Sequence, residues 1–310
     1  MLPVMLMGPT AAGKSALAVR LAHALDGEIL NADAMQVYHG LDIGTGKLPP
    51  GERRGIPHHL LDLLNAHGVF SAGEFRRLTL ACLDDVRLRG RRSILVGGTG
   101  FYLKALAKTL APMPDVPPTT RVALNGLLDR HGSTAMHRML KVLDPDAAER
   151  IAPGDRQRIE RALEVILVSG RPFSAFHGGE LSGGDRQPFL KIGLFLPRPL
   201  LRERIHERVI QMVKGGWVEE VRRLLELGVD PECHAFKSIG YRELAEVVRG
   251  RIPVEEAVER TVVRTHQFAK RQMTWFRREE GIFWVDASVA DIAFQQTLGY
   301  ITLRDKENNI

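Results

Sequence analysis

The 310-residue sequence is poor in cysteine and contains no long apolar run. Cys82 and Cys233 are far apart and belong to no CxxC pair, so neither a disulfide framework nor a zinc site is indicated. No segment approaches the ~18 to 20 apolar residues that a membrane span needs, and the apolar start lacks the basic residues of a targeting signal. We therefore expect a globular protein of the reducing cytoplasm, with no membrane partner.

The charge balance is basic. Lys and Arg exceed Asp and Glu, which gives a net charge of +6 and a pI near 9.5. This balance suits a polyanionic partner, although a merely solvated basic surface remains an alternative. The length allows one large α/β domain with an insertion, or two domains.

The most specific local pattern is GPTAAGKS at residues 8–15, which lies between an apolar run and a helical pattern. Glycines at Gly8 and Gly13 let the backbone curl until several amide N–H groups point at one anion. Lys14 adds a positive charge, and the Ser15 hydroxyl is a ligand for Mg²⁺ that bridges phosphate oxygens. We predict that a phosphate or diphosphate is bound by Gly8, Pro9, Thr10, Ala11, Ala12, Gly13, Lys14 and Ser15. The reaction must be inferred from other residues, because such a loop only holds the anion.

An acidic residue follows the next predicted strand. Asp33 comes after the buried segment 28–30, and in a parallel sheet this places it beside the loop that follows the first strand. An Asx-turn or helix-capping role explains Asp33 equally well. The glycine-rich segment 40–47, GLDIGTGK, is a candidate for a loop that closes over the site.

The strand predicted at 93–96 ends in GGTG, residues 97–100, where a typical P-loop NTPase has an aspartate that helps to hold Mg²⁺. This argues for a site that binds phosphates without being built for ordinary ATP hydrolysis, with the Thr99 hydroxyl directed at the anion. Asp33 could instead supply the carboxylate that this aspartate provides in other P-loop proteins.

Prolines at 112–118 mark a linker, after which residues 119–170 show three helical patterns with no strand between them. A polar loop at 178–187 precedes a return to strand character. We therefore predict an α/β protein with a P-loop NTPase-like parallel sheet core, formed by residues 1–112 and 188–286. An all-helical insertion domain is predicted at 113–187, and residues 287–310 are left as a tail of unknown role.

The clearest helical pattern, 254–278, has an apolar stripe and a second stripe that alternates arginine with aromatic residues. The second stripe includes Arg264, Phe268, Arg271 and Trp275. Arginine suits phosphate contact and aromatic rings suit base stacking. A solvated basic face with rings folded into the core is the alternative. The basic helical insertion favours RNA.

Several blocks resemble, in order, the tRNA dimethylallyltransferases, also called tRNA isopentenyltransferases. These blocks are 8–15, 31–47, 58–62, 96–106, 156–174, 239–243 and 268–277. The resemblance implies transfer of a dimethylallyl group from dimethylallyl diphosphate to the exocyclic amine of the adenosine just 3′ of the tRNA anticodon, with release of diphosphate. It also implies Mg²⁺ as a cofactor and the tRNA anticodon stem-loop as a partner, and we expect a monomer.

The resemblance also assigns roles to residues. Asp33 matches the general base, Thr99 and Arg121 match positions near the reacting centre, and Arg242 matches a diphosphate ligand. Two segments match tRNA contacts: Asp33, Ala34, Met35 and Gln36, and then Gln157, Arg158, Ile159, Glu160 and Arg161. Ala34 departs from the serine expected there, which puts a supporting hydrogen bond in doubt.

Two other functions remain open. A small-molecule or nucleoside kinase also needs a P-loop, Mg²⁺ and a carboxylate base. An RNA-binding module with a vestigial P-loop would bind tRNA without turnover, although the intact Lys14 and Ser15 argue against it.

Overall fold

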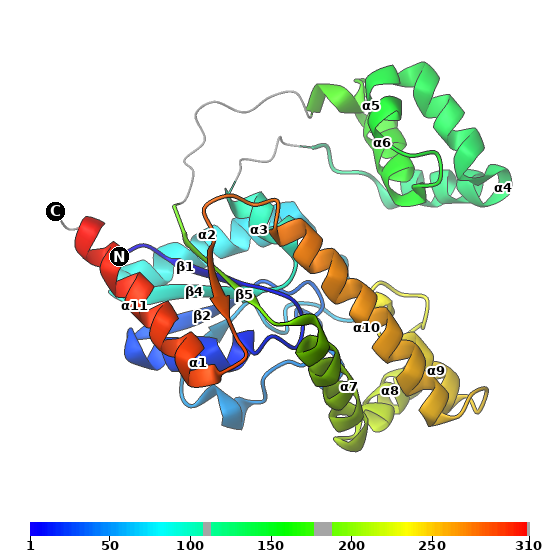
Figure 1. The fold of residues 1–310 in the computed structure, drawn as a ribbon. Coiled ribbons are helices and arrows are strands. Elements are labelled where there is room, and N and C mark those ends of the chain that lie inside the picture. The colour runs from blue at the N-terminus through cyan, green and yellow to red at the C-terminus, as the bar shows by residue number, and fades with distance from the viewer. Residues whose placement is uncertain (108–112, 177–187, 309–310) are drawn as a thin grey trace. The chain divides into compact units, whose positions relative to one another are not determined.

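The computed structural model describes residues 1–107, 113–176 and 188–308 (Figure 1). It divides into two compact units, one formed by Met1–Ala107 with Gln187–Ile310 and the other by Lys108–Arg186. The second unit corresponds to the helical insertion predicted at 113–187. The predicted polar loop at 178–187, and Pro112 of the linker, lie outside the described residues.

The first unit is built on a parallel sheet, as the sequence predicts. Its described strands lie in the order β3-β2-β4-β1-β5-β6 and all pair in parallel. They are β1 (Val4–Met7), β2 (Gly27–Asn31), β3 (His58–His59), β4 (Arg92–Gly97), β5 (Leu190–Phe195) and β6 (Phe283–Asp286). Every residue of β1 is buried, because both its edges are paired and both its faces are covered.

Alternate residues of β1 face opposite cores. Met5 and Met7 belong to a core with the helices that follow β3, β4 and β5, whereas Val4 and Leu6 belong to a core on the other face. The helices that contribute to the first core are α2 (Ala72–Leu88), α3 (Gly100–Ala107), α7 (Arg198–Lys214), α8 (Trp217–Glu226), α9 (Tyr241–Val248) and α10 (Val254–Phe276). The second core is covered by α1 (Lys14–Ala24) and α11 (Ala290–Asn308). Among the described residues, no helix combines the length and the apolar character needed to cross a membrane.

The C-terminal segment corrects the prediction of a tail from residue 287. It forms α11, which contacts α1 and buries Ala293 and Ile301 in the second core. The buried Arg92 guanidinium, at the start of β4, donates to both carboxylate oxygens of Asp305 at 2.7 and 2.6 Å. This end of the chain is therefore an integral part of the sheet unit.

The second unit contains the three helices predicted for it, within the part that the structure describes. These are α4 (Pro118–Leu143), α5 (Pro145–Arg150) and α6 (Arg156–Ser169). The helix α4 bends at Gly132, whose φ of +76° is not helical. The unit has its own apolar core, with Leu124, Leu140 and Leu163 fully buried. It therefore has the packing of a separate domain.

Candidate active site

Three loops meet at the carboxyl edge of the sheet. The strand order makes β2, β4 and β1 neighbours, so the loops that follow them are adjacent. The amide N–H of Ala34 donates to Thr99 Oγ1 at 3.1 Å, which joins the loop after β2 to the loop after β4. The structure thus brings Asp33, Thr99 and the P-loop to one place, as the positions of these residues after successive strands predict.

The P-loop has the backbone expected of an anion-binding loop. Ala11 and Gly13 have φ values of +61° and +82°, and such left-handed residues turn successive amides toward one point. Gly13 is the N-cap of α1, so the positive end of this helix is directed at the loop. Lys14 Nζ donates to the carbonyl of Pro9 at 2.7 Å, and Ser15 is exposed in the first turn of α1.

Positive charge is concentrated beside Asp33. Burial and the charge of Arg208 lower the pKa of Lys14 to about 8, while Asp33 raises it. Arg208, from α7, is itself half-buried, and burial lowers its pKa against the opposing effect of Asp33. Two cations held close together favour an anion between them. Arg208 was not among the residues predicted from the sequence.

Asp33 fits both interpretations that the sequence left open. Its Oδ1 accepts from the Met35 amide at 2.9 Å, which is the Asx turn. Its own amide donates to Asn31 Oδ1 at 2.9 Å, and Asn31 Nδ2 donates to the carbonyl of Leu60 at 3.0 Å. These bonds fix the orientation of the Asp33 carboxylate. Its negative charge interacts with Lys14 and Arg208 and raises the pKa of each.

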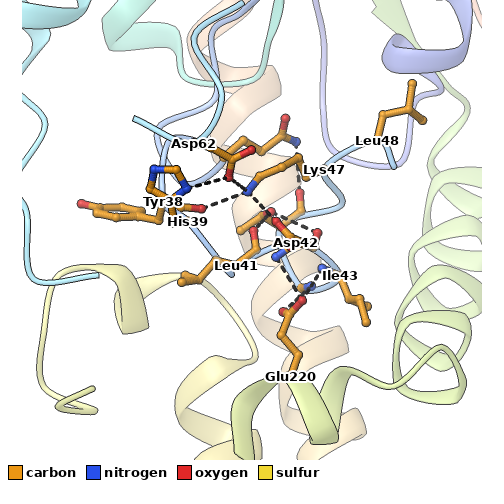
Figure 2. A network of polar contacts seen from close by, with 12 residues as sticks. Tyr38, His39, Leu41, Asp42, Ile43, Lys47, Leu48, Asp62 and Glu220 are labelled. Atoms are coloured by element: carbon orange, nitrogen blue, oxygen red, sulfur yellow. Dashed lines mark hydrogen bonds and ion pairs between the residues drawn. The ribbon is translucent and has the colours of Figure 1, made fainter. Parts of the chain in front are cut away.

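The segment 40–47 is anchored by Glu220 of α8, a buried carboxylate (Figure 2). Glu220 accepts from the amides of Asp42, Ile43 and Gly44 at 3.0, 2.7 and 3.3 Å. The Tyr241 hydroxyl donates to the same carboxylate at 2.6 Å, and burial together with Glu220 holds the pKa of Tyr241 well above its usual value. Tyr241 therefore remains a donor.

Lys47 anchors the other end of this segment. Its buried ammonium donates to Asp42 and Asp62, both at 2.6 Å, and to the Tyr38 carbonyl at 2.9 Å (Figure 2). The segment is therefore held at both ends by buried charged groups, and its closure over the site stays a prediction.

The anchored segment supports Arg208. A Cβ at Gly46 would collide with the Arg208 guanidinium, so the side chain lies directly against the backbone of this residue. Gln36 Nε2 donates to the carbonyls of Thr45 and Gly46 at 3.2 and 3.4 Å. The segment 40–47 thus packs against Arg208 and supports its side chain.

The second stripe of α10 is divided between surface and core. The Arg271 guanidinium lies 5.9 Å from the ring centroid of the half-buried Phe268, and Arg264 forms an ion pair with Glu243. Trp275 is half-buried, and its indole lies where a side chain on Gly100 would be. Trp275 therefore follows the alternative of a ring folded inward, whereas the Arg271 side chain is exposed.

Arg242, predicted as a diphosphate ligand, forms an ion pair with Glu232 at 2.9 Å. Among the described residues, Arg242 makes no hydrogen bond or ion pair with the P-loop. Arg208 is the arginine whose charge acts on Lys14.

The helical unit holds the remaining predicted residues. Arg121 and Arg161 both pair with the buried Glu164, at 3.3 and 3.0 Å. Gln157 and Arg158 are exposed, and Glu160 is half-buried. Ile159 is fully buried in the core of this unit, so its side chain is a packing residue and the prediction that it contacts tRNA is wrong for the side chain.

A parallel sheet with a P-loop after β1, and with a carboxylate and two cations at its carboxyl edge, defines an α/β protein of the P-loop class, whose backbone amides and charges suit a phosphorylated ligand. Within that class, the model of the IPP transferase family matches residues 36–279. The chain belongs to this family and is a prenyltransferase, as the sequence blocks predict.

Curated relatives agree over nearly the full length. The tRNA dimethylallyltransferase of Geobacter metallireducens is 45% identical over 91% of this chain and 92% of its own length. That of Pseudarthrobacter chlorophenolicus is 44% identical over 93% of this chain and 95% of its own length.

Solved structures give the same result for the fold. A full-length tRNA isopentenylpyrophosphate transferase from Bacillus halodurans matches with a TM-score of 0.72 and 34% identity, over 99% of this chain and 98% of its own. A eukaryotic dimethylallyltransferase described as acting on tRNA matches with a TM-score of 0.80 and 26% identity, over 96% of this chain and 78% of its own.

Proposed function

We propose that this protein transfers a dimethylallyl group from dimethylallyl diphosphate to the exocyclic amine of the adenosine just 3′ of the anticodon in tRNA, as a monomer in the cytoplasm. The observation that carries this proposal is the placement of the Asp33 carboxylate beside two cations, Lys14 and Arg208, at the mouth of the P-loop. A base and a grip on a leaving anion are what alkylation of an amine by a diphosphate ester requires.

The leaving group is held by the P-loop. The bond between the allylic carbon and the diphosphate oxygen breaks, and the electron pair leaves with the diphosphate. Lys14, Arg208 and the N-terminal amides of α1 stabilise the charge that develops on it. The anchored segment 40–47 keeps Arg208 in place while this happens.

The acceptor is activated by Asp33. The amine of adenine is a poor nucleophile because its lone pair is delocalised into the ring, so a carboxylate that takes the proton as the new carbon–nitrogen bond forms lowers the barrier. The Asx turn and Asn31 keep the carboxylate in one orientation. Thr99 contributes by holding the Ala34 amide.

Mg²⁺ is part of the proposal. The described residues contain no cluster of three or more His, Cys, Asp or Glu side chains that would form an all-protein metal site. Mg²⁺ is often held by one or two protein oxygens together with substrate phosphates. The exposed Ser15 hydroxyl at the start of α1 fits that donor set. When bound, the ion would neutralise charge on the diphosphate.

Recognition of tRNA is assigned to two surfaces. Phe268 and Arg271 on α10 offer a ring and a guanidinium for a base pulled out of the anticodon loop. Gln157, Arg158 and Arg161 in the helical unit are proposed to contact the RNA backbone. Unstacking one base costs a few kcal/mol, which such contacts can offset.

The test is an assay with purified protein, dimethylallyl diphosphate, Mg²⁺ and unmodified tRNA, followed by nucleoside mass analysis. We expect one dimethylallyl group on adenosine. An unchanged adenosine mass, in the same conditions where a positive-control enzyme raises it, would overturn the proposal. Calorimetry with ATP distinguishes a kinase, which would bind ATP in preference to the prenyl diphosphate, and tRNA binding without turnover would identify an RNA-binding module.

Replacing the base gives a sharper test. Asp33→Asn keeps the shape of the side chain but removes the proton acceptor, so kcat should fall by about a hundredfold or more, as expected for loss of a general base. The affinity for tRNA should change little. Asp85→Asn, at an exposed position of α2, is the matched control and should retain full activity. Equal kcat values for Asp33→Asn and wild type would remove Asp33 from the base role.

A further inference from the structure

One side chain links the two phosphate-facing loops, and nothing in the reaction described above uses it. Gln272 of α10 is buried, with 6% of its surface exposed. Its Oε1 accepts from the Thr10 amide of the P-loop at 2.9 Å, and its Nε2 donates to the Gly98 carbonyl at 2.9 Å. The two loops follow β1 and β4, so a single amide from a distant helix connects them.

The chemistry of the partners determines the orientation of this amide. A backbone N–H can only donate and a backbone carbonyl can only accept, so Oε1 must face Thr10 and Nε2 must face Gly98. Glutamine supplies both an acceptor and a donor at this length. Glutamate at pH 7 would place a carboxylate oxygen against the Gly98 carbonyl oxygen, and methionine would leave both backbone groups without a partner.

The surrounding residues are built for this contact. A Cβ at Gly98 would collide with Nε2 of Gln272, so the glycine is needed for the close approach of the loop to α10. Trp275, one helical turn further along α10, fills the space over Gly100 of the same loop. The face of α10 that carries Phe268 therefore also holds the loop after β4.

The bond to Thr10 also determines which P-loop amides can reach a ligand. The Thr10 N–H is directed at Gln272, so the anion must be bound by amides further along the loop, toward the start of α1. The Gly98 carbonyl, a partial negative charge beside an anion site, is neutralised by Nε2.

We propose that Gln272 is a positioning residue, which sets the spacing between the P-loop and the loop 97–100 and so shapes the cradle for the diphosphate of the prenyl donor. The identity of the ligand as a prenyl diphosphate rests on the proposed function. The role of Gln272 in diphosphate binding does not depend on the transfer step.

The experiment compares wild type, Gln272→Met and Gln272→Glu by calorimetry with inorganic diphosphate and Mg²⁺, and by steady-state kinetics. Gln272→Met should weaken diphosphate binding by about tenfold or more, because the buried Gly98 carbonyl and the half-buried Thr10 amide lose their partner. KM for the donor should rise in parallel, while the Kd for tRNA stays within about twofold. Gln296→Met, an exposed glutamine on α11, is the matched control and should leave all three values unchanged.

Gln272→Glu provides a readout that a merely structural role would not produce. A neutral glutamic acid can again donate to the Gly98 carbonyl, so diphosphate affinity relative to wild type should recover as the pH falls and the new side chain is protonated. This comparison also decides the matter if Gln272→Met fails to fold, since a constant ratio across pH would overturn the proposal.

The possible failures are distinguishable. If a folded Gln272→Met protein has the diphosphate affinity and donor KM of the wild type, the positioning role is overturned. The proposed prenyl transfer is not affected by that result. A wild-type protein that binds diphosphate but transfers no prenyl group would overturn the proposed function, and a weakened Gln272→Met would still support the role of Gln272.

Discussion

At the residue scale, the charge state of Lys14 should control donor binding. Its pKa in the ligand-free protein is about 8, and a bound diphosphate, being an opposite charge, should raise it. Affinity should therefore fall as the pH rises above 8, and binding there should be coupled to proton uptake. Calorimetry in buffers of different ionisation enthalpy measures this uptake. In Lys14→Arg the side chain stays charged, so the proton uptake due to Lys14 should be absent. Identical proton uptake in both proteins would contradict the prediction.

Arg208 should influence the same equilibrium. Because its charge lowers the pKa of Lys14, Arg208→Gln should move the pH break of diphosphate affinity upward while weakening binding at pH 7 by about tenfold or more, as for loss of a charge-assisted contact. Arg242→Gln is the matched arginine control. Since Arg242 is paired with Glu232, it should alter neither quantity. A larger effect from Arg242→Gln than from Arg208→Gln would restore the prediction made from the motif around Arg242.

The two arginines show where reasoning from the sequence reached its limit. Asp33 and Thr99 were predictable because each follows a strand directly, and parallel strands deliver their carboxyl ends to one edge. Arg208 lies in α7 among other charged residues and has no local pattern to distinguish it. Gln272 lies inside the block 268–277, one of the segments that resemble the family, so the sequence marked the segment as functional. The role of Gln272 itself depends on how α10 packs against the two loops, which the sequence does not show.

At the element scale, α8 should stabilise the donor site through Glu220. Glu220→Gln would place an NH₂ group against backbone N–H groups, so we expect the free energy of unfolding to fall by about 2 to 4 kcal/mol, since hydrogen bonds to a buried charge are lost. Diphosphate affinity should fall as well, because the segment behind Arg208 loosens. Urea unfolding and calorimetry measure the two effects. Glu219→Gln, one residue earlier and exposed, should show neither.

The last helix offers a second test at this scale. Asp305→Asn leaves the buried Arg92 guanidinium without its anion, so the free energy of unfolding should fall by about 2 to 3 kcal/mol, somewhat less than for a fully buried pair. Asp291, also on α11, forms an ion pair with Arg20 of α1, but the Asp291 side chain is 86% exposed. Asp291→Asn is therefore expected to change the free energy of unfolding little. Equal stability of Asp305→Asn and wild type would show that α11 does not depend on this bond.

The helix α11 also explains why the end of the chain was not predicted. The helix α10 could be predicted as residues 254–278 from its apolar stripe, whereas the buried residues of α11 are few and partly small or polar, such as Ala293 and Thr297. Its attachment depends on Asp305 reaching Arg92, more than two hundred residues earlier in the chain. Contacts of this kind carry no periodic signal in the sequence.

At the scale of the whole molecule, we expect donor binding to depend on the sheet unit alone and tRNA binding to depend on both units. The sheet unit contains the P-loop, Asp33 and Arg208, whereas the helical unit has its own core and exposed basic residues. Donor binding should therefore be insensitive to changes on the helical unit. Affinity for tRNA should depend on both units and on salt, since contacts to RNA phosphates release counterions.

Arg158→Gln tests this division. If Arg158 contacts an RNA phosphate, its loss should lower tRNA affinity and reduce the slope of log K against log salt by about 0.7, the value for one single-stranded phosphate contact. Diphosphate affinity should stay at the wild-type value. Arg130→Gln removes the same charge from an exposed position on α4 and is the control for a general electrostatic effect. If Arg130→Gln lowers affinity as much as Arg158→Gln, the contribution of the helical unit is its overall charge, and the specific contacts must be sought on α10.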